Sequence, residues 1–240
     1  MNVRPYTYFS ELYSFLMKSI DYPFWSNYIK EIHETIGNKN DVALELASGN
    51  CKLSEELKSQ FRKLYVTDIS LQMLQKNLTL TNKICCDMVY LPFKIKFDFI
   101  YSTFDSINYL ADEVHLNKFF NNIGKFISKK GFFVFDVSLK KNSLKHLKKL
   151  NRKGEYNNIK FEQISTFDKK TMIHSNIINF ELEDGKKFSE VHNQKIYDFY
   201  YYFDVIDSNN LLVVECFDAF DFKNGSPDSE RIQFIVKRKK

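Results

Sequence analysis

Short apolar runs alternate with amphipathic stretches through the first 140 residues, and no other feature constrains the fold as strongly. The stretches 53–61, 70–78 and 114–127 have the apolar spacing of helices. Apolar strands joined by helices are typical of βαβ units, whose parallel sheet is covered on both faces. We therefore predict an α/β fold. The expected strands are 42–46, 64–68, 83–86, 97–101 and 132–137.

The two ends of the chain depart from this central pattern. Apolar residues at helical spacing around Tyr13 and Trp25 predict two helices before residue 40. Residues 159–196 alternate in polarity and carry turn signals at 168–170 and 183–185, which favours antiparallel hairpins. Two further strands, 211–217 and 231–237, are expected to complete the main sheet.

These patterns predict a single domain over residues 1–240, which is an ordinary size for one hydrophobic core. We expect three parts within it. They are a helical cap (1–40), a Rossmann-like core (41–139 and 197–240) and an antiparallel cap insertion (140–196).

Composition narrows the classes of partner. The net charge is +5, but only five of the 35 basic residues are arginine, the residue best suited to bidentate phosphate contacts, so nucleic acid is not the expected partner. The four cysteines lack metal-ligand spacing, which predicts reduced thiols and no metal.

The N-terminus has no signal-peptide core, and no apolar run is long enough to span a bilayer. We expect a cytoplasmic protein and leave its oligomeric state open.

Acidic residues stand in order at the ends of successive predicted strands. Glu45 precedes a turn with Gly49, Asp68 follows that glycine by 19 residues, and Asp87 follows the third strand. An acid about 20 residues beyond a glycine turn binds ribose hydroxyls in nucleotide-binding βαβ units. The sequence has no GxGxxG, and Glu45 would repel a pyrophosphate. A ligand with a ribose and an ammonium group, such as S-adenosylmethionine, fits better.

In their order and spacing, several segments together resemble class I S-adenosylmethionine-dependent methyltransferases. The similarity is strongest to a bacterial small-molecule branch that includes sugar N-methyltransferase-like proteins. It implies a Rossmann-like fold with a mostly parallel seven-stranded sheet, helices on both faces and an antiparallel substrate cap. The matching segments are 44–49, 66–70, 86–88, 91–93, 97–98, 105–110, 131–137, 190–192 and 229–232, with Tyr13, Asp21–Tyr22 and 25–29 in the N-terminal cap.

The resemblance also implies roles for single residues in holding the cofactor. Glu45 would bind the methionine amino group, Asp68 the ribose hydroxyls, and Asp87, beside the Met88 backbone, the adenine amino group. Gly49 would let the backbone approach the cofactor, and Tyr13 would reach the methionine carboxylate or serve as a core ring. The expected cofactor-binding set also includes Ala47 and Ile69 from these segments and Thr103, which lies between two of them. The chain departs from the family at Cys51, where glycine is usual.

Methyl transfer needs a base only if the nucleophile arrives protonated. The candidates are His192, Glu190, Tyr109 and His115. Glu190 and His192 would share one face of an alternating strand.

Three functions stay open at this point. The first is methylation of a small molecule on nitrogen or oxygen, and seven basic residues within 140–153 make an anionic or nucleotide-linked acceptor one option. The second is RNA modification, motivated by the basic tail 237–240. The third is cofactor binding without catalysis, motivated by Cys51.

Overall fold

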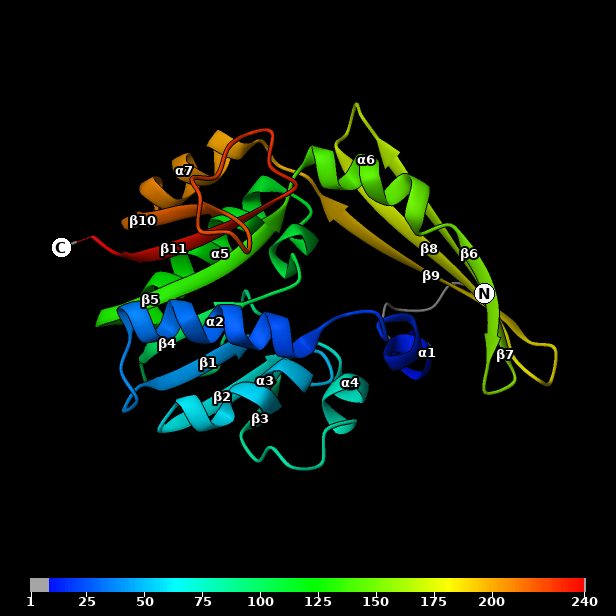
Figure 1. The fold of residues 1–240 in the computed structure, drawn as a ribbon, viewed down its shortest axis with the longest axis horizontal. Helices are drawn as coiled ribbons and strands as arrows, with labels where there is room; N and C mark the ends of the chain where they lie inside the picture. The colour runs from blue at the N-terminus through cyan, green and yellow to red at the C-terminus, as the bar shows by residue number, and fades with distance from the viewer. Residues whose placement is uncertain (1–8, 240) are drawn as a thin grey trace.

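The computed structural model describes residues 9–239, which form two sheets joined through a short helical turn. The main sheet has seven strands in the order β10-β11-β5-β4-β1-β2-β3. Six of them point the same way, and β11 points the opposite way. The cap sheet has four antiparallel strands, β6-β7-β8-β9. The carboxyl ends of the parallel strands point toward the cap sheet (Figure 1).

The element bounds follow the chain order. The helices are α1 (Phe9–Leu16), α2 (Tyr22–Ile36), α3 (Lys52–Leu57), η1 (Lys58–Gln60), α4 (Leu71–Gln75), η2 (Ser106–Tyr109), α5 (Glu113–Phe126), α6 (Lys140–Lys149) and α7 (Phe199–Ser208). The strands are β1 (Val42–Leu46), β2 (Lys63–Asp68), β3 (Lys83–Cys85), β4 (Phe97–Ser102), β5 (Ile127–Ser138), β6 (Arg152–Tyr156), β7 (Ile159–Asp168), β8 (Ile173–Glu181), β9 (Lys187–Lys195), β10 (Leu211–Asp218) and β11 (Arg231–Arg238).

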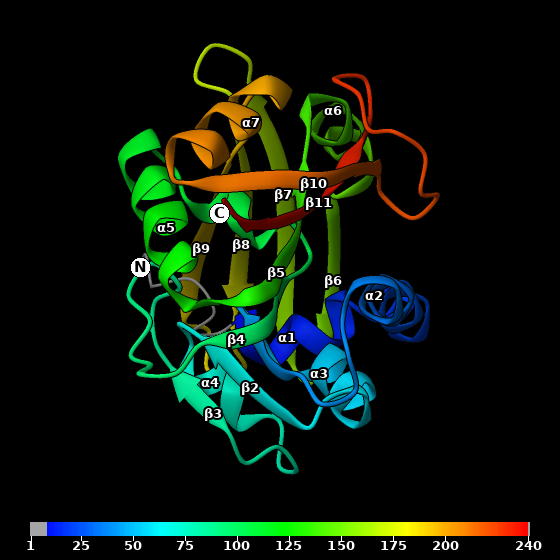
Figure 2. The same cartoon turned by 90° about the vertical axis from the view of Figure 1, so that its left-hand side faces the viewer.

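Helices cover both faces of the main sheet, with α5 and α7 on one side and α2 and α3 on the other (Figure 2). Alternation along a strand sends successive side chains into the two cores. In β5, Phe133 and Phe135 pack with α5 and α7, whereas Val134 packs with α2 and α3. A sheet buried on both faces explains why these strands are continuous apolar runs.

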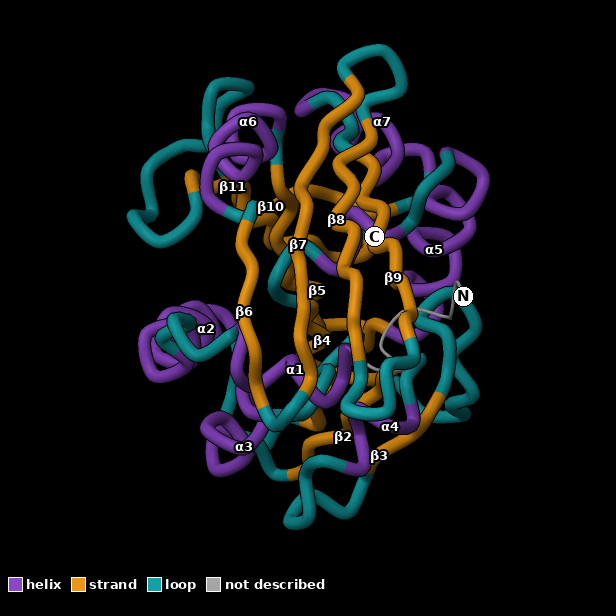
Figure 3. Tube along the Cα trace, turned by 90° about the vertical axis from the view of Figure 1, so that its right-hand side faces the viewer, coloured by secondary structure: helices purple, strands orange, loops and turns teal. Residues whose placement is uncertain are grey.

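The cap sheet lies across the end of the main sheet with its other face outward (Figure 3). Helix α1 closes part of its inner face, because Leu12 and Leu16 pack on Phe161, Ile178 and Phe180. The rest of that face is polar and buried, and it includes Glu190 and His192. The polar half of the cap sheet is therefore the half turned toward the strand ends.

The predicted fold class is confirmed, including the seven-stranded sheet and the antiparallel cap. The two hairpin turns and both C-terminal strands lie where the sequence predicts them. Ser70 is the N-cap of α4, since its hydroxyl accepts a hydrogen bond from the Met73 amide. The pattern missed β6 and α7; α7 is rich in aromatic residues, which are weak helix formers, and its clearest signal was the Asp198 N-cap. Within residues 9–239, no helix is long and apolar enough to cross a membrane.

Candidate active site

A strained turn follows β1 at the carboxyl edge of the main sheet. Ala47, Gly49 and Cys51 all have left-handed backbone conformations, with φ of 52°, 55° and 59°. Only glycine adopts such values without a steric penalty. A Cβ at Gly49 would lie 3.3 Å from the Met73 Cε and 3.7 Å from the Tyr13 hydroxyl. The turn therefore brings bare backbone close to α1 at the strand ends.

Asp68 ties the ends of β1 and β2 together. Its carboxylate accepts hydrogen bonds from the Gly49 amide (2.7 Å) and the Ser70 amide (2.8 Å). Burial raises the pKa of this carboxyl, although the backbone donors oppose the shift. A carboxylate has about four lone-pair sites, so Asp68 keeps acceptor capacity for a hydroxyl-bearing ligand.

Glu45 is buried between β4 and α3. The Tyr101 hydroxyl donates to its Oε2 atom (3.2 Å), and the Ser54 hydroxyl donates to the same oxygen. Burial raises its pKa well above the ordinary range, and the nearby charge of Asp68 acts in the same direction. Glu45 thus lies at the carboxyl edge of the main sheet, and the hydroxyls that bond to it come from buried residues of β4 and α3.

Four other predicted cofactor residues surround the ends of β2, β3 and β4. Asp87 accepts a hydrogen bond from the Val89 amide (2.8 Å) and is half-buried, like Met88. Ile69 follows Asp68 directly and is 68% exposed, while Thr103 is buried just beyond β4. The edge thus combines carboxylate acceptors with exposed apolar surface.

Tyr13 reaches this edge from α1, where its hydroxyl lies near the Gly49 backbone. Burial raises the pKa of its hydroxyl well above the usual value, and the nearby Tyr22 and Tyr109 hydroxyls and Asp68 add to the shift. Tyr13 therefore lies between the glycine turn and the turn that carries Tyr109.

The three residues predicted as catalytic come together across the two sheets. The Tyr109 hydroxyl lies 3.5 Å from His192 Nδ1, and His192 Nε2 lies 3.4 Å from Glu190 Oε2. Tyr109 belongs to η2, whereas His192 and Glu190 are buried on the inner face of β9. The shared face of Glu190 and His192 follows from strand alternation, but their meeting with Tyr109 is a tertiary contact. The other base candidate, His115, is exposed on α5 and pairs with Asp112.

Sequence reasoning missed an ionic cluster beside η2. The Arg231 guanidinium contacts the buried carboxylate of Asp136 and lies 3.5 Å from Asp105 Oδ1. Burial raises the pKa of Asp136 to about 6, against the lowering effect of Arg231. An aspartate within the apolar run of β5 and one of the few arginines were the available signals.

Asn108 was missed as well, and it joins the two sheets. It is fully buried, and its amide nitrogen donates to the Lys195 carbonyl (2.8 Å) on β9 and to the Ser138 carbonyl (3.3 Å) on β5. Its oxygen accepts from the Ser138 amide (2.9 Å). The turn that carries Tyr109 is thus fixed to both sheets.

Two further features of the sequence analysis are Cys51 and the basic segment 140–153. Cys51, which stands where the similar family usually has glycine, is fully buried, and its Sγ lies 3.5 Å from the Ser48 Oγ and points to the Gly49 carbonyl. Several lysines of the basic segment 140–153 lie on the exposed side of α6, where Lys145 pairs with Glu230.

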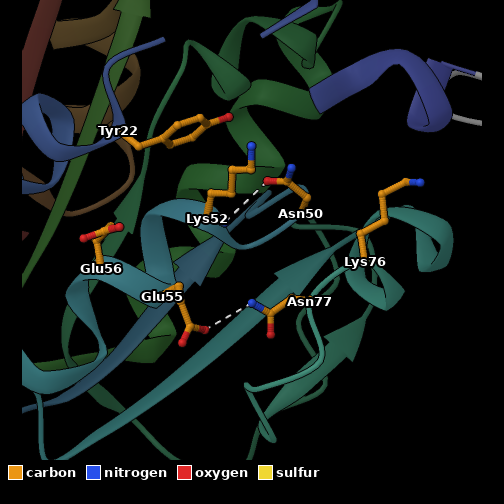
Figure 4. Close-up of a pocket in the computed structure, with 7 residues that line it drawn as sticks. All are labelled: Tyr22, Asn50, Lys52, Glu55, Glu56, Lys76 and Asn77. Atoms are coloured by element: carbon orange, nitrogen blue, oxygen red, sulfur yellow. Dashed lines mark hydrogen bonds between the residues drawn. The ribbon is translucent and has the colours of Figure 1, made fainter. Parts of the chain in front are cut away.

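A separate surface cavity of about 380 Å³ lies between α2, α3 and α4 (Figure 4). None of the predicted cofactor or catalytic residues lines it. Glu55 on its wall bonds to Asn77 (3.1 Å), and the hydrogen bonds from Lys58, Thr79 and Asn77 lower its pKa to about 2. The lining residues are Tyr22, Asn50, Lys52, Glu55, Glu56, Lys76 and Asn77.

Comparison with known proteins decides the family. Residues 44–135 match the model of a methyltransferase domain family. The structure superposes on an S-adenosylmethionine-dependent methyltransferase from Clostridium acetobutylicum with a TM-score of 0.80 and 25% identity, covering 98% of this chain and 99% of that one. Residues 44–135 therefore form a methyltransferase domain, and the whole chain has the fold of an S-adenosylmethionine-dependent methyltransferase. The resemblance seen in the sequence, the enzyme class and the cofactor are thereby confirmed.

Other solved methyltransferases share the fold at lower identity. The sugar N-methyltransferase KedS8 from a Streptoalloteichus species has a TM-score of 0.74 and 16% identity, covering 96% of this chain and 93% of that one. CalS10, an amino pentose methyltransferase from Micromonospora echinaspora solved with S-adenosylmethionine bound, has a TM-score of 0.69 and 10% identity, covering 95% and 96%. No curated protein shows a significant sequence match.

The strand ends of this methyltransferase fit the cofactor chemically. Asp68 and Asp87 offer carboxylate oxygens, Ile69 offers exposed apolar surface, and the bare backbone at Gly49 permits close approach. These groups match a ribose, an adenine ring and a methionine chain.

Proposed function

We propose that the methyltransferase transfers the methyl group to a small molecule held between the main sheet and the cap sheet. The observation that carries this proposal is the line of Tyr109, His192 and Glu190, which joins η2, beyond the end of β4, to β9 of the cap sheet. Tyr109 follows a strand of the main sheet and His192 and Glu190 lie on the cap sheet, and a site between two packed sheets suits a small ligand better than an RNA strand.

On this proposal, the roles of the cofactor residues follow the strand ends. Asp68 accepts from the ribose hydroxyls, Asp87 from the adenine amino group, and Glu45 from the methionine ammonium. Ile69 and Met88 pack against the adenine ring, Thr103 and Ala47 border the ligand, and Tyr13 lies near the methionine end.

The bound cofactor supplies a methyl group on a sulfonium, which is already a strong electrophile. The protein must then orient the acceptor and remove its proton. Tyr109 lies closest to the strand ends and passes the proton toward His192 Nδ1. Glu190, buried beside His192 Nε2, stabilises the imidazolium that forms.

Charge favours an amine acceptor. Glu190 pairs with His192, and beside η2 the two carboxylates of Asp105 and Asp136 share the single guanidinium of Arg231. An excess of buried negative charge attracts a cationic group and repels an anion. We infer that nitrogen is the methylated atom.

An anionic portion of the acceptor remains a second option, because α6 presents exposed lysines near the ionic cluster. In that case a nucleotide or phosphate group would lie along α6 while the amine enters the interior. Acceptor affinity would then fall steeply with added salt.

The test uses transfer of a radiolabelled methyl group from S-adenosylmethionine to panels of small amines, alcohols and RNA. We expect labelling of an amine, and a loss of at least 100-fold in the His192→Gln variant with unchanged affinity for S-adenosylhomocysteine. His115→Gln is the matched control and should keep full activity. Labelling of RNA alone, or full activity in His192→Gln, would contradict the proposal.

A further inference from the structure

One carboxylate oxygen of Glu45 is occupied and the other is not. Oε2 accepts hydrogen bonds from both the Tyr101 and the Ser54 hydroxyls. Among the described residues, no hydrogen bond reaches Oε1. The side chain is only 2% exposed, but Oε1 is not among the fully buried oxygens that lack a partner, so this small exposure includes it. A buried carboxylate held by one oxygen presents the other to a ligand.

The two hydroxyls that hold Oε2 come from an otherwise apolar setting. Tyr101 is fully buried in the cluster between the main sheet and α2 and α3, stacked at 6.2 Å from Phe61. Phenylalanine would fill such a position, so the hydroxyl has a specific partner rather than a packing role. Ser54 is likewise fully buried on α3.

The titratable groups near Glu45 come from each neighbouring element. They are Asp68 on β2, Tyr101 on β4, Cys51 before α3 and Tyr22 on α2. Lys83 on β3 acts on Cys51. Asp68 and the burial of the site both disfavour a second negative charge, whereas a cation placed at Oε1 would favour it.

We propose that Tyr101 and Ser54 are positioning residues that hold Glu45 by Oε2 and present Oε1 to the ammonium group of the cofactor, and that cofactor binding releases a proton from Glu45. The proposal rests on the proposed role of Glu45 in holding that ammonium group. In the free enzyme, burial and the nearby charge of Asp68 favour the protonated form of this carboxyl. The arriving ammonium stabilises the carboxylate, and the proton leaves to solvent.

The test is titration calorimetry of the full chain with S-adenosylhomocysteine, which carries the same ammonium group. Measurements in buffers of different ionisation enthalpy give the number of protons released. We expect net proton release on binding at mildly acidic pH, and an affinity that falls by up to tenfold per pH unit as the pH is lowered. Binding with no proton release and no pH dependence would overturn the proposal.

Variants separate the groups. Because the Tyr101 hydrogen bond lowers the pKa of Glu45, Tyr101→Phe should move the affinity profile to higher pH, and Ser54→Ala should weaken binding. Tyr28→Phe, which removes a buried hydroxyl from the same cluster without touching Glu45, should leave the profile in place. An unmoved profile in Tyr101→Phe overturns the positioning role.

Glu45→Gln distinguishes this failure from failure of the proposed role. The variant should bind more weakly and release no proton. Release that persists in Glu45→Gln would belong to Asp68 and overturn the present assignment. Unchanged affinity in Glu45→Gln would remove the role of Glu45 in cofactor binding itself.

Discussion

Asp68 shows how one side chain serves both a site and the fold. The sequence pattern indicated a strand-end acid that would bind the ribose hydroxyls of the cofactor. In the structure its two oxygens accept the Gly49 and Ser70 amides, so the residue also fixes the turn after β1. Replacing Asp68 should therefore affect both cofactor binding and the stability of the fold.

We expect Asp68→Ala to weaken S-adenosylhomocysteine binding at least tenfold, since hydrogen bonds to an ionised carboxylate contribute about 1.5–3 kcal/mol each. The melting temperature should fall too, because two amides lose their acceptor. Asp98→Ala is the control, since Asp98 accepts the Val42 amide (3.1 Å) at the opposite edge of the sheet. That variant should lose stability and keep its affinity. Equal affinities for wild type and Asp68→Ala would show that Asp68 is structural only.

At the scale of an element, the turn after β1 places non-glycine residues in left-handed conformations. Cys51 precedes α3 rather than lying within it, so the cost of glycine in a helix interior does not apply to this position. Its side chain faces the core, which leaves no reason for glycine there to tighten cofactor binding.

Comparing Cys51→Gly with Cys51→Ala tests this setting. In a helix interior alanine is more stable than glycine by about 1 kcal/mol. At φ of 59° the order should reverse by about 1 kcal/mol, because alanine keeps the left-handed strain. Urea unfolding measures the difference. Both variants should keep their affinity for S-adenosylhomocysteine within about twofold. A clear gain of affinity in Cys51→Gly would show instead that the thiol crowds the cofactor.

At the scale of the whole molecule, the catalytic line depends on how the cap sheet sits on the main sheet. Asn108 bonds to Ser138 on β5 and to Lys195 on β9, and Gln194 adds a bond to the Asp105 carbonyl. These contacts hold η2 between the sheets and place Tyr109 opposite His192.

Asn108→Ala should therefore loosen the cap as well as the fold. Unsatisfied buried groups at Ser138 and Lys195 predict a loss of about 2 kcal/mol or more in unfolding free energy. Faster hydrogen exchange should be concentrated in β9 and η2. Asn82→Ala, which removes a bond to the Leu64 carbonyl (3.1 Å), is the control and should leave exchange in β9 unchanged. Uniform exchange across the molecule would contradict the joining role.

The sequence by itself determined the succession of most strands and helices along the chain, the hairpins of the cap and the acids at the strand ends. It could do so because burial on two faces and a glycine turn leave marks at short range, in apolar runs such as β4 and in the spacing of Gly49 and Asp68. Helix α7 was not predicted, because its aromatic residues favour no single local structure.

Only the tertiary structure decided which side chains meet. Tyr109 and His192 are 83 residues apart, and the ionic cluster joins Asp105 to Arg231 through Asp136. The hydroxyl that holds Glu45 comes from β4, in the middle of an apolar run. Such contacts depend on strand order and on the seating of the cap, and these arise from packing between distant segments that no local pattern encodes.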